Sequence, residues 1–513
     1  MESFIPHPLF AGIAFLLTGL ALGAGTCGGL VRYWPKTARG WDAGDLVRKS
    51  QKTPVMRLGG IGVAVALLVI IPVASLLLEP AATRVGDPWS LLFVCLLFFA
   101  IGVVDDLMPV PATGKLLLQF GAALIAFGLG FQIELITEPF GGNSMAVGGF
   151  ALPITVFWLI AIPNLINLVD GIDGVAGGVG ISLVGTLAVV AWMGGDWLLF
   201  AICLGMIGSL IGFLFFNLPS ARVYLGDGGA YLVGAFVALS SIQASQKGAV
   251  AGALFVIVLA LALPIADTVF AILRRSFYGF PIWKADSEHI HHRLVTLGVR
   301  KGLVIGGMIA TVTIFSLMGL SLVAEDGQTW PVVLTICIAS VLLLIRLLGY
   351  WGSFGAFVNH MRRVLMTREK VRYAYALGCV LEHEIDRTSE KDEFWSDFSR
   401  SLKKVGLFPI SSNHPCPDDM VAMRIPLASG EEWLLAHRPG TRDMHWGKVA
   451  ACFLGPLSRA MHKWGQIPPQ LGVKGAAEML DLLSEREPNE VPVPLKKVIR
   501  IIKKQKIGEF GKK

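Results

Sequence analysis

Four short stretches of polar residues interrupt a sequence that is otherwise strongly apolar. They read "GVVDDLMPVPATGKLLLQF", "NLINLVDGIDG", "FNLPSARVYLGDGGA" and "KADSEHIHHRL". Together they offer carboxylates, carboxamides, histidines and lysines, but no cysteine. Hard oxygen ligands of this kind suit Mg²⁺ or Mn²⁺, which typically join one or two carboxylates to the phosphates of a substrate. Cationic side chains then hold the remaining phosphate oxygens and stabilise charge during transfer. The four stretches therefore indicate a metal-dependent site that handles phosphates.

Asn164, Asn167, Asp170 and Asp173 recur at intervals of three residues in the second stretch. Residues three apart on a helix are offset by about 60°, so the first three can share a stripe that faces the interior of a helix bundle. Two glycines then end the helix and leave Asp173 on a turn whose backbone can approach a ligand closely. Because polar groups inside a membrane are costly unless they are paired or wet, we interpret this stripe as functional.

Each of the other three stretches could also be explained by structure alone, without a function. These structural explanations become less convincing when all of them must hold at once. Asp105 and Asp106 stand side by side, and Lys115 follows in the same stretch. Adjacent carboxylates near a basic residue favour metal or phosphate chemistry, although a solvated helix end is the simpler alternative. Asp227 lies in "LGDGG", where glycines would let a diphosphate approach, although an ordinary turn has the same composition. The "HIHH" cluster lacks the HExxH arrangement, which disfavours a zinc protease.

The composition predicts the elements that must position these residues. Of the 513 residues, 54% are hydrophobic and only 16% are charged, with a mean hydropathy of +0.64, whereas soluble domains are roughly 25% charged. We predict an all-α polytopic membrane domain over residues 1–350, with about eleven helices long enough to cross the hydrocarbon core and a retained first span. The predicted segments are 9–31, 59–79, 89–107, 115–133, 149–167, 175–193, 197–216, 229–243, 249–273, 302–323 and 330–349.

The charges of the loops predict the orientation. The loops that would lie on one side of the membrane carry fifteen Lys and Arg residues, and those on the other side carry two. This asymmetry places the basic side in the cytoplasm and the N-terminus outside. All four polar stretches then lie on the cytoplasmic face of the inner (plasma) membrane.

Residues 351–513 are predicted to form a cytosolic C-terminal domain with a basic tail. "KDEFWSDFSRSLKKVGLF" and "KVAACFLGPLSRAMHKW" have the periodicity of helices, and "MVAMRIPL" and "EEWLLAHRP" read as short strands. These elements suffice for one small α/β domain near 380–465. The basic ends are suited to a membrane surface, and the histidines of the tail show no ligand spacing.

Six motifs occur in order between about residues 30 and 300: "KTPVMRLGGIGV", "GVVDDL", "NLINLVDGIDG", "FNLPSARVYLGDGG", "LPIADTVFAILRR" and "ADSEHIHHRL". In these motifs the chain resembles the polyprenyl-phosphate N-acetylhexosamine-1-phosphate transferases of glycosyltransferase family 4. The resemblance implies transfer of a sugar-1-phosphate from a UDP-sugar to undecaprenyl phosphate or a related polyprenyl phosphate. UMP is released, and the step primes cell-envelope polysaccharide synthesis. The implied cofactor is Mg²⁺, with Mn²⁺ as an alternative. The implied partners are a UDP-N-acetylhexosamine, the polyprenyl phosphate and membrane lipids, without nucleic acid, and a homodimer is left open.

The resemblance also implies three sets of site residues. The catalytic set is Asp105, Asp106, His289, His291 and His292, with Asp105 preferred as the base or orienting group. The substrate-binding set is Lys52, Lys115, Asn167, Asp173, Asn217 and Arg274, with Asn217 at the uridine. The metal set is Asp170 and Asp227.

The donor and the class of function have alternatives. Ser287 and Glu288 stand where relatives that use N-acetylglucosamine commonly carry an arginine, and this departure would let a changed epimer or a deoxy-aminosugar serve as the donor. The signature of the muropeptide branch is absent, which disfavours a UDP-muramoyl-pentapeptide. Because the other motifs resemble the N-acetylglucosamine branch, we favour UDP-N-acetylglucosamine as the donor. A lipid or solute transporter or flippase with a regulatory tail would also bury charges, but it should show broken helices at the midplane and a repeat between halves. A signalling protein would leave the polar stretches unexplained. Release of UMP that depends on Mg²⁺ would separate the enzyme from both.

Overall fold

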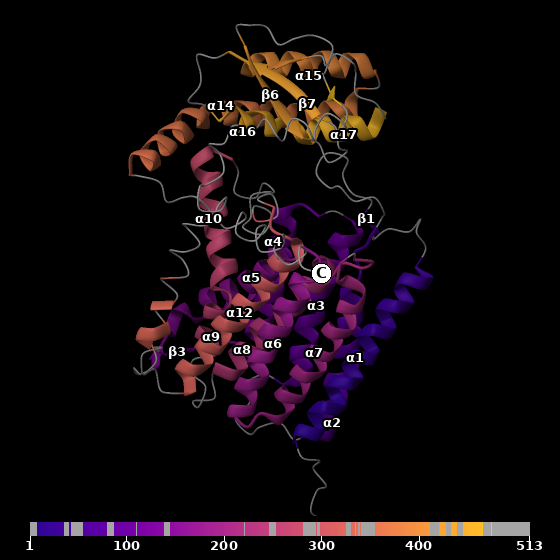
Figure 1. Cartoon of the computed structure of the whole chain (residues 1–513). Coiled ribbons are helices and arrows are strands. Elements are labelled where there is room, and N and C mark those ends of the chain that lie inside the picture. The colour runs from indigo at the N-terminus through magenta and orange to yellow at the C-terminus, as the bar shows by residue number, and fades with distance from the viewer. Residues whose placement is uncertain are drawn as a thin grey trace, which may run out of the picture. The chain divides into compact units, whose positions relative to one another are not determined.

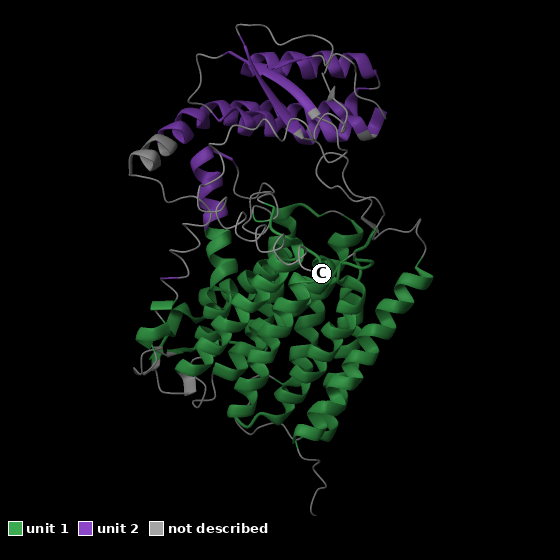
Figure 2. Cartoon of the chain, in the orientation of Figure 1, with its two compact units in different colours: residues 1–42, 55–269, 288–338 green, residues 43–54, 270–287, 339–513 purple. Residues whose placement is uncertain are grey.

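The computed structural model divides the chain into two compact units, each described here by itself. The first unit comprises residues 1–42, 55–269 and 288–338, and the second comprises 43–54, 270–287 and 339–513 (Figure 2). The structure describes residues 8–34, 41–42, 55–78, 87–108, 110–137, 144–219, 221–245, 253–280, 294, 298–324, 330–333, 335–336, 339, 354–388, 390–410, 420–426, 432–438, 445–464 and 473–474.

The first unit is a bundle of apolar helices (Figure 1). Within the described residues, eight helices are long and apolar enough to cross a membrane, and a bent pair would make nine. The eight are α1 (Pro8–Tyr33), α2 (Gly60–Leu77), α3 (Pro88–Leu107), α5 (Ala151–Val169), α6 (Val175–Met193), α7 (Trp197–Asn217), α8 (Gly226–Ser245) and α12 (Lys301–Ala324). The bent pair is α9 (Ala253–Ala260) and α10 (Ala262–Tyr278), which meet at 61°.

This architecture confirms a polytopic helical membrane protein, but it does not confirm a count of eleven spans. The predicted fourth span is α4 (Ala112–Gly128), an apolar helix of only 17 residues. The predicted ninth span is bent between α9 and α10, and most of the predicted segment 330–349 lies outside the described residues. Two short antiparallel strand pairs were not predicted. In the first, β1 (Trp41–Asp42) pairs with β2 (Val55–Met56), and in the second, β3 (Leu135–Thr137) pairs with β4 (Ser144–Ala146).

Helix α8 lies at the centre of the bundle, and it corresponds to the short predicted segment 229–243. Its spanning window is entirely buried, in contact with α2, α3, α5 and α6. Small residues permit this close packing. A Cβ added at Gly234 would lie 2.3 Å from the Cα of Pro163 on α5, so the backbones of the two helices nearly touch there. The N-terminus of α8 carries Asp227, and its neighbours therefore determine what surrounds this carboxylate.

The second unit contains the small α/β fold of the tail. Helix α14 (Phe354–Arg387) is followed by α15 (Lys391–Val405), β5 (Phe408–Pro409), β6 (Val421–Pro426), β7 (Glu432–His437), α16 (Trp446–Ala450), the 3₁₀ helix η3 (Ala451–Phe453), α17 (Leu454–Trp464) and β8 (Val473–Lys474). Strand β7 pairs antiparallel with β5, β6 and β8. Phe394, Phe398, Trp433 and Phe453 form the centre of its core. The first helix and the two strands expected from the tail sequence are present as α15, β6 and β7. The second expected helix, 448–464, is instead divided among α16, η3 and α17, and the long helix α14 was not predicted.

Candidate active site

A backbone contact joins the start of α2 to the start of α8. Tyr224 N donates to Met56 O at 2.6 Å, Gly59 N donates to Tyr224 O at 2.9 Å, and Gly60 N donates to Leu225 O at 2.9 Å. Because these residues lie more than 160 positions apart in the chain, the contact brings the motif "TPVMRLGG" next to the motif "GDGG". Arg57 is thereby held beside the N-terminus of α8.

Asp106, at the end of α3, caps the N-terminus of α8. Its Oδ1 accepts a hydrogen bond from Asp227 N at 3.1 Å, and its Oδ2 accepts one from Gly228 N at 2.9 Å. A carboxylate satisfies free amide groups there and interacts favourably with the helix dipole. Gly226 has a φ of +74°, and a Cβ on it would lie 2.0 Å from Arg57 O and 2.6 Å from Asp106 Oδ2. Only glycine allows this junction of three segments.

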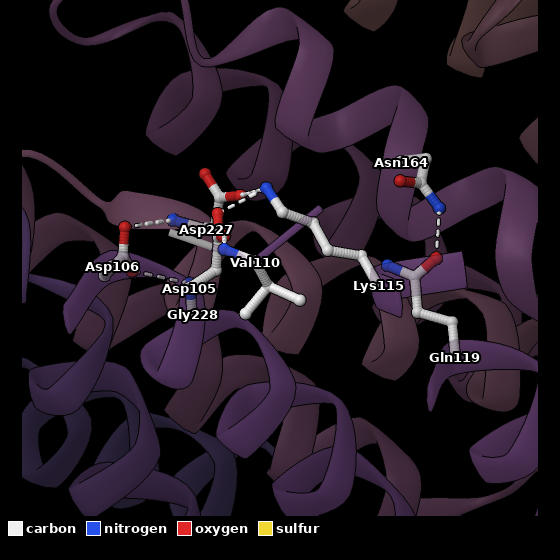
Figure 3. A network of polar contacts seen from close by, with 8 residues as sticks. All are labelled: Asp105, Asp106, Val110, Lys115, Gln119, Asn164, Asp227 and Gly228. Atoms are coloured by element: carbon white, nitrogen blue, oxygen red, sulfur yellow. Dashed lines mark hydrogen bonds and ion pairs between the residues drawn. The ribbon is translucent and has the colours of Figure 1, made fainter. Parts of the chain in front are cut away.

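Lys115, in the first turn of α4, links two carboxylates from different helices (Figure 3). Its Nζ forms ion pairs with Asp105 Oδ2 and, at 3.1 Å, with Asp227 Oδ2. Val110 N donates to the other oxygen of Asp105 at 2.8 Å. The three charged side chains are between 13% and 24% exposed, so they are screened from bulk water but still accessible to a ligand.

The end of α5 brings further carboxylates to this cluster. Asp170 follows the last turn of α5, where its amide donates to the carbonyl groups of Ile166 and Asn167 at 3.2 Å. Burial raises the pKa of Asp170 well above its usual value. The negative charges of Asp227 and Asp106 raise it further, and the positive charge of Arg57 opposes the shift. The carboxylates are therefore close enough to repel one another.

The turn after α5 is tied to the rest of the site by side chains that accept backbone hydrogen bonds. Asn217 Oδ1 accepts from Gly174 N at 2.7 Å, and Asn217 Nδ2 donates to Val223 O at 2.8 Å. Asp173 Oδ2 lies 3.4 Å from Ala221 N. Asn217 is buried, and its contacts hold the turn against the segment that leads into α8.

The structure gathers much of the predicted site in one place. Asp105, Asp106, Lys115, Asp170, Asp173 and Asp227 form a continuous network of ion pairs, hydrogen bonds and electrostatic interactions. Asn167 lies on the last turn of α5, next to this network. Arg274 lies on α10 in the second compact unit. Lys52, His289, His291 and His292 lie outside the described residues.

Two residues of this network were missed by the sequence reasoning. Arg57 interacts electrostatically with Asp106 and Asp170, and Tyr231, four residues after Asp227, interacts with Asp227 and Lys115. Arg57 belongs to a motif that was recognised, and a cation next to paired glycines was the available signal. Tyr231 offers no such signal, because it stands in an apolar helix.

The donor chemistry of the cluster fits a hard divalent cation. Five carboxylates face two cationic side chains, Lys115 and Arg57, and the negative charge in excess would be relieved by a cation. Among the described residues, no group of three His, Cys, Asp or Glu side chains is arranged to hold a metal ion. A few carboxylates that share the ion with substrate phosphates would match the usual binding of Mg²⁺.

Comparisons with known proteins match this chain to one family model and to several relatives. The family model described as glycosyl transferase family 4 matches residues 88–245, which include α3 to α8. The chain is 31% identical over 252 residues to a probable undecaprenyl-phosphate N-acetylglucosaminyl 1-phosphate transferase of Bacillus subtilis, covering 49% of this chain and 69% of the relative. It is 30% identical over 325 residues to the decaprenyl-phosphate N-acetylglucosaminephosphotransferase of Mycolicibacterium smegmatis, covering 58% and 79%. It is 28% identical over 257 residues to the phospho-N-acetylmuramoyl-pentapeptide-transferase of Enterococcus faecalis, covering 48% and 77%.

Proposed function

Because the chain belongs to glycosyl transferase family 4 and is a membrane-embedded sugar-phosphate transferase, we propose that it moves N-acetylglucosamine-1-phosphate from UDP-N-acetylglucosamine to a polyprenyl phosphate. UMP would be the second product. Undecaprenyl phosphate is the acceptor that we propose, and the step would prime the synthesis of a cell-envelope polysaccharide. The donor proposal is supported by the names of the two relatives that use N-acetylglucosamine.

The observation that carries the proposal is the position of Lys115 between Asp105 and Asp227 at the N-terminus of α8. Two anionic phosphates must approach each other in this reaction, and cationic groups must offset their repulsion before they reach reactive geometry. A lysine ammonium can exchange one carboxylate for a phosphate oxygen, and the N-terminus of α8 adds the positive end of a helix dipole.

The reaction would proceed by direct displacement. An oxygen of the lipid phosphate attacks the phosphorus that carries the sugar, a new phosphorus–oxygen bond forms, and the bond to the phosphate of UMP breaks. In this proposal Asp105 orients the lipid phosphate and takes up its proton, while Asp106 keeps the start of α8 in place. Asp170 and Asp227 would hold a divalent ion, Mg²⁺ or Mn²⁺, which neutralises charge on the diphosphate when it is bound.

The remaining predicted residues complete the proposed site. Asn167, Asp173 and Asn217 would line the nucleotide pocket, where Asn217 acts at least partly through the turn that it holds. The other cations and the histidines would contact phosphates or the sugar. These are Lys52, His289, His291, His292 and Arg274.

The test is an assay of the purified chain in nanodiscs that contain undecaprenyl phosphate. With an equimolar mixture of UDP-aminosugars and Mg²⁺, we expect UMP release and a lipid product with the mass of the N-acetylglucosamine adduct. EDTA and the variant Asp227→Asn should each abolish both signals. A different aminosugar on the lipid would refute the donor, and a folded wild-type chain that forms no lipid-linked sugar from any donor would refute the transferase.

The proposed orientation can be tested separately. A cysteine at Gly194, between α6 and α7, should react with an impermeant maleimide on intact cells, whereas a cysteine at the C-terminus should react only after lysis. The reverse pattern would place the site on the wrong face for a cytosolic nucleotide sugar.

A further inference from the structure

Three polar residues, of which Gln119 and Tyr231 are buried and Asn164 is half-buried, lie one helical turn deeper in the bundle than residues of the site. Gln119 follows Lys115 by four positions on α4, and Tyr231 follows Asp227 by four positions on α8. Asn164 precedes Asn167 by three positions on α5. Residues three or four apart share one face of a helix. The three residues therefore form a second polar level, here called the polar layer, directly below the site.

The members of the polar layer contact one another across three helices. Asn164 Nδ2 donates to Gln119 Oε1 at 2.7 Å (Figure 3). The same amide group also donates to the carbonyl oxygen of Ile160 at 2.8 Å. The Tyr231 phenol interacts with Gln119 and also with the charges of Asp227 and Lys115. Gln119 is 0% exposed and Tyr231 is 2% exposed, so neither side chain can touch a substrate in this arrangement.

Gln119 lowers the stability of the bundle at this position. Its Nε2 is buried and, among the described residues, has no hydrogen-bond partner of normal geometry, although the Tyr231 phenol interacts with the same side chain. A buried amide donor without a partner lowers stability, whereas two apolar side chains of similar size would avoid this cost. The neighbouring side chains on α4, Leu116, Leu117, Leu118 and Phe120, are exposed apolar residues. An apolar side chain at position 119 would therefore suit the stability of the bundle at least as well.

We propose that the polar layer positions the site: the Gln119–Asn164 hydrogen bond and its neighbour Tyr231 set the register of α4, α5 and α8. Apolar contacts hold helices together without fixing their rotation or their shift along the axis, whereas a buried hydrogen bond has a defined length and direction. A single buried polar pair can specify register in helix bundles at a cost in stability.

The register matters because Lys115 must reach carboxylates on two other helices. Lys115 and Gln119 are both on α4, so a shift or rotation of α4 that breaks the contact with Asn164 also moves the lysine away from Asp227. A displacement of about 1 Å in a reacting group can lower a rate on the order of 100-fold. The inference rests on the proposed function, because it assigns these residues to the geometry of that reaction.

The test compares Gln119→Leu/Asn164→Leu and Tyr231→Phe with the wild-type chain, and with Gln119→Asn/Asn164→Gln, which exchanges the two side chains. We expect the double leucine variant to lose at least tenfold in kcat while KM for the nucleotide sugar stays within twofold and the melting temperature does not fall. Tyr231→Phe should lower kcat in the same way, and the exchanged pair should recover at least threefold over the leucine variant.

A matched control is the polar contact between α6 and α12. Ser182 Oγ and Thr313 Oγ1 lie 2.9 Å apart in the same bundle, outside the site. Ser182→Ala/Thr313→Val should leave kcat unchanged. An equal loss of kcat in this control, or a fall in melting temperature that accompanies the loss in the leucine variant, would assign the polar layer to stability alone and overturn the proposal.

A second measurement needs no substrate and so separates this inference from the proposed reaction. In the wild-type chain the two carboxylates that pair with Lys115 should slow the reaction of its amine with an amine-reactive reagent. The extent of modification is measured by mass spectrometry of the peptide that contains Lys115. The leucine variant should be modified at Lys115 at least threefold faster. Unchanged labelling together with unchanged kcat would refute the positioning role. A wild-type chain without transferase activity would refute the proposed function, and faster labelling would still support the register effect.

Discussion

Gly102 on α3 gives a sharp test of how closely the site depends on helix packing. A Cβ added at this position would lie 2.4 Å from the backbone C and O of Asp227 and from Gly228 N. These are main-chain atoms that cannot rotate away, so in Gly102→Ala the two helices must separate by about 1 Å to restore ordinary contact. Overpacking of this kind costs about 1–3 kcal/mol of stability.

The effect on the site should exceed the effect on stability. Asp106 lies one turn after Gly102, and its hydrogen bonds to Asp227 N and Gly228 N are 3.1 and 2.9 Å long. A separation of about 1 Å would lengthen both beyond hydrogen-bonding distance. The same shift would displace Asp227 from Lys115, and a misplacement of that size can cost on the order of 100-fold in rate. We therefore expect Gly102→Ala to lower kcat by about two orders of magnitude.

The assay is UMP release by the variant in nanodiscs, with its melting temperature measured in the same preparation. Gly121→Ala on α4 is the matched control, since a Cβ at Gly121 meets nothing within 4 Å. This control should keep its activity and gain stability, because alanine is favoured over glycine in a helix by roughly 1 kcal/mol. Activity of Gly102→Ala within twofold of the wild-type value would refute the claim that the contact of α3 with α8 sets the geometry of the site.

Three further predictions concern single side chains. Lys115→Gln leaves the carboxylates of Asp105 and Asp227 without the cation that lies between them, so it should lower UMP release at least 100-fold at any Mg²⁺ concentration. Recovery of activity at high Mg²⁺ would show that the lysine amine only supplies positive charge. Arg57→Gln removes the positive charge beside Asp106 and Asp170, so kcat/KM should fall at least tenfold, with Arg57→Lys intermediate, and an unchanged value would exclude Arg57 from the site. Asp87 caps α3 by accepting from Trp89 N at 2.7 Å and Ser90 N at 3.1 Å, and although partial burial raises its pKa, the hydrogen bonds from Ser90 and Trp89 make the pKa lower than usual. Because the pKa of Asp87 is lowered in the folded chain, the stability that its ionised carboxylate contributes is present above the ordinary aspartate pKa and is lost as the pH falls through the folded pKa. Asp87→Ala should therefore lower the stability by about 1 kcal/mol at pH 7 and by less in acid, and it should leave transfer intact. A difference in melting temperature between variant and wild type that is independent of pH would contradict this prediction.

The sequence by itself determined the class of the protein and many of the candidate site residues. Apolar segments of the right length predict spanning helices because the bilayer imposes a minimum length, and eight of the predicted segments are long apolar helices in the structure. The predicted topology put the polar stretches on one face of the membrane, and the family resemblance assigned Asp105, Lys115, Asp170 and Asp227 to one candidate site. The structure brings these four together.

Only the tertiary structure decided how these residues act on one another. The cap that Asp106 places on α8 joins positions more than 100 residues apart, and no local periodicity encodes such a contact. Gln119 and Tyr231 stand in apolar helices and differ from ordinary packing residues only through their neighbours on other helices. The bend between α9 and α10 and the end of α4 at Gly128 were likewise found only in the structure. Hydropathy reports where a helix can cross the membrane, but the rotation and register of each helix arise from contacts between helices, and these set the geometry of the site.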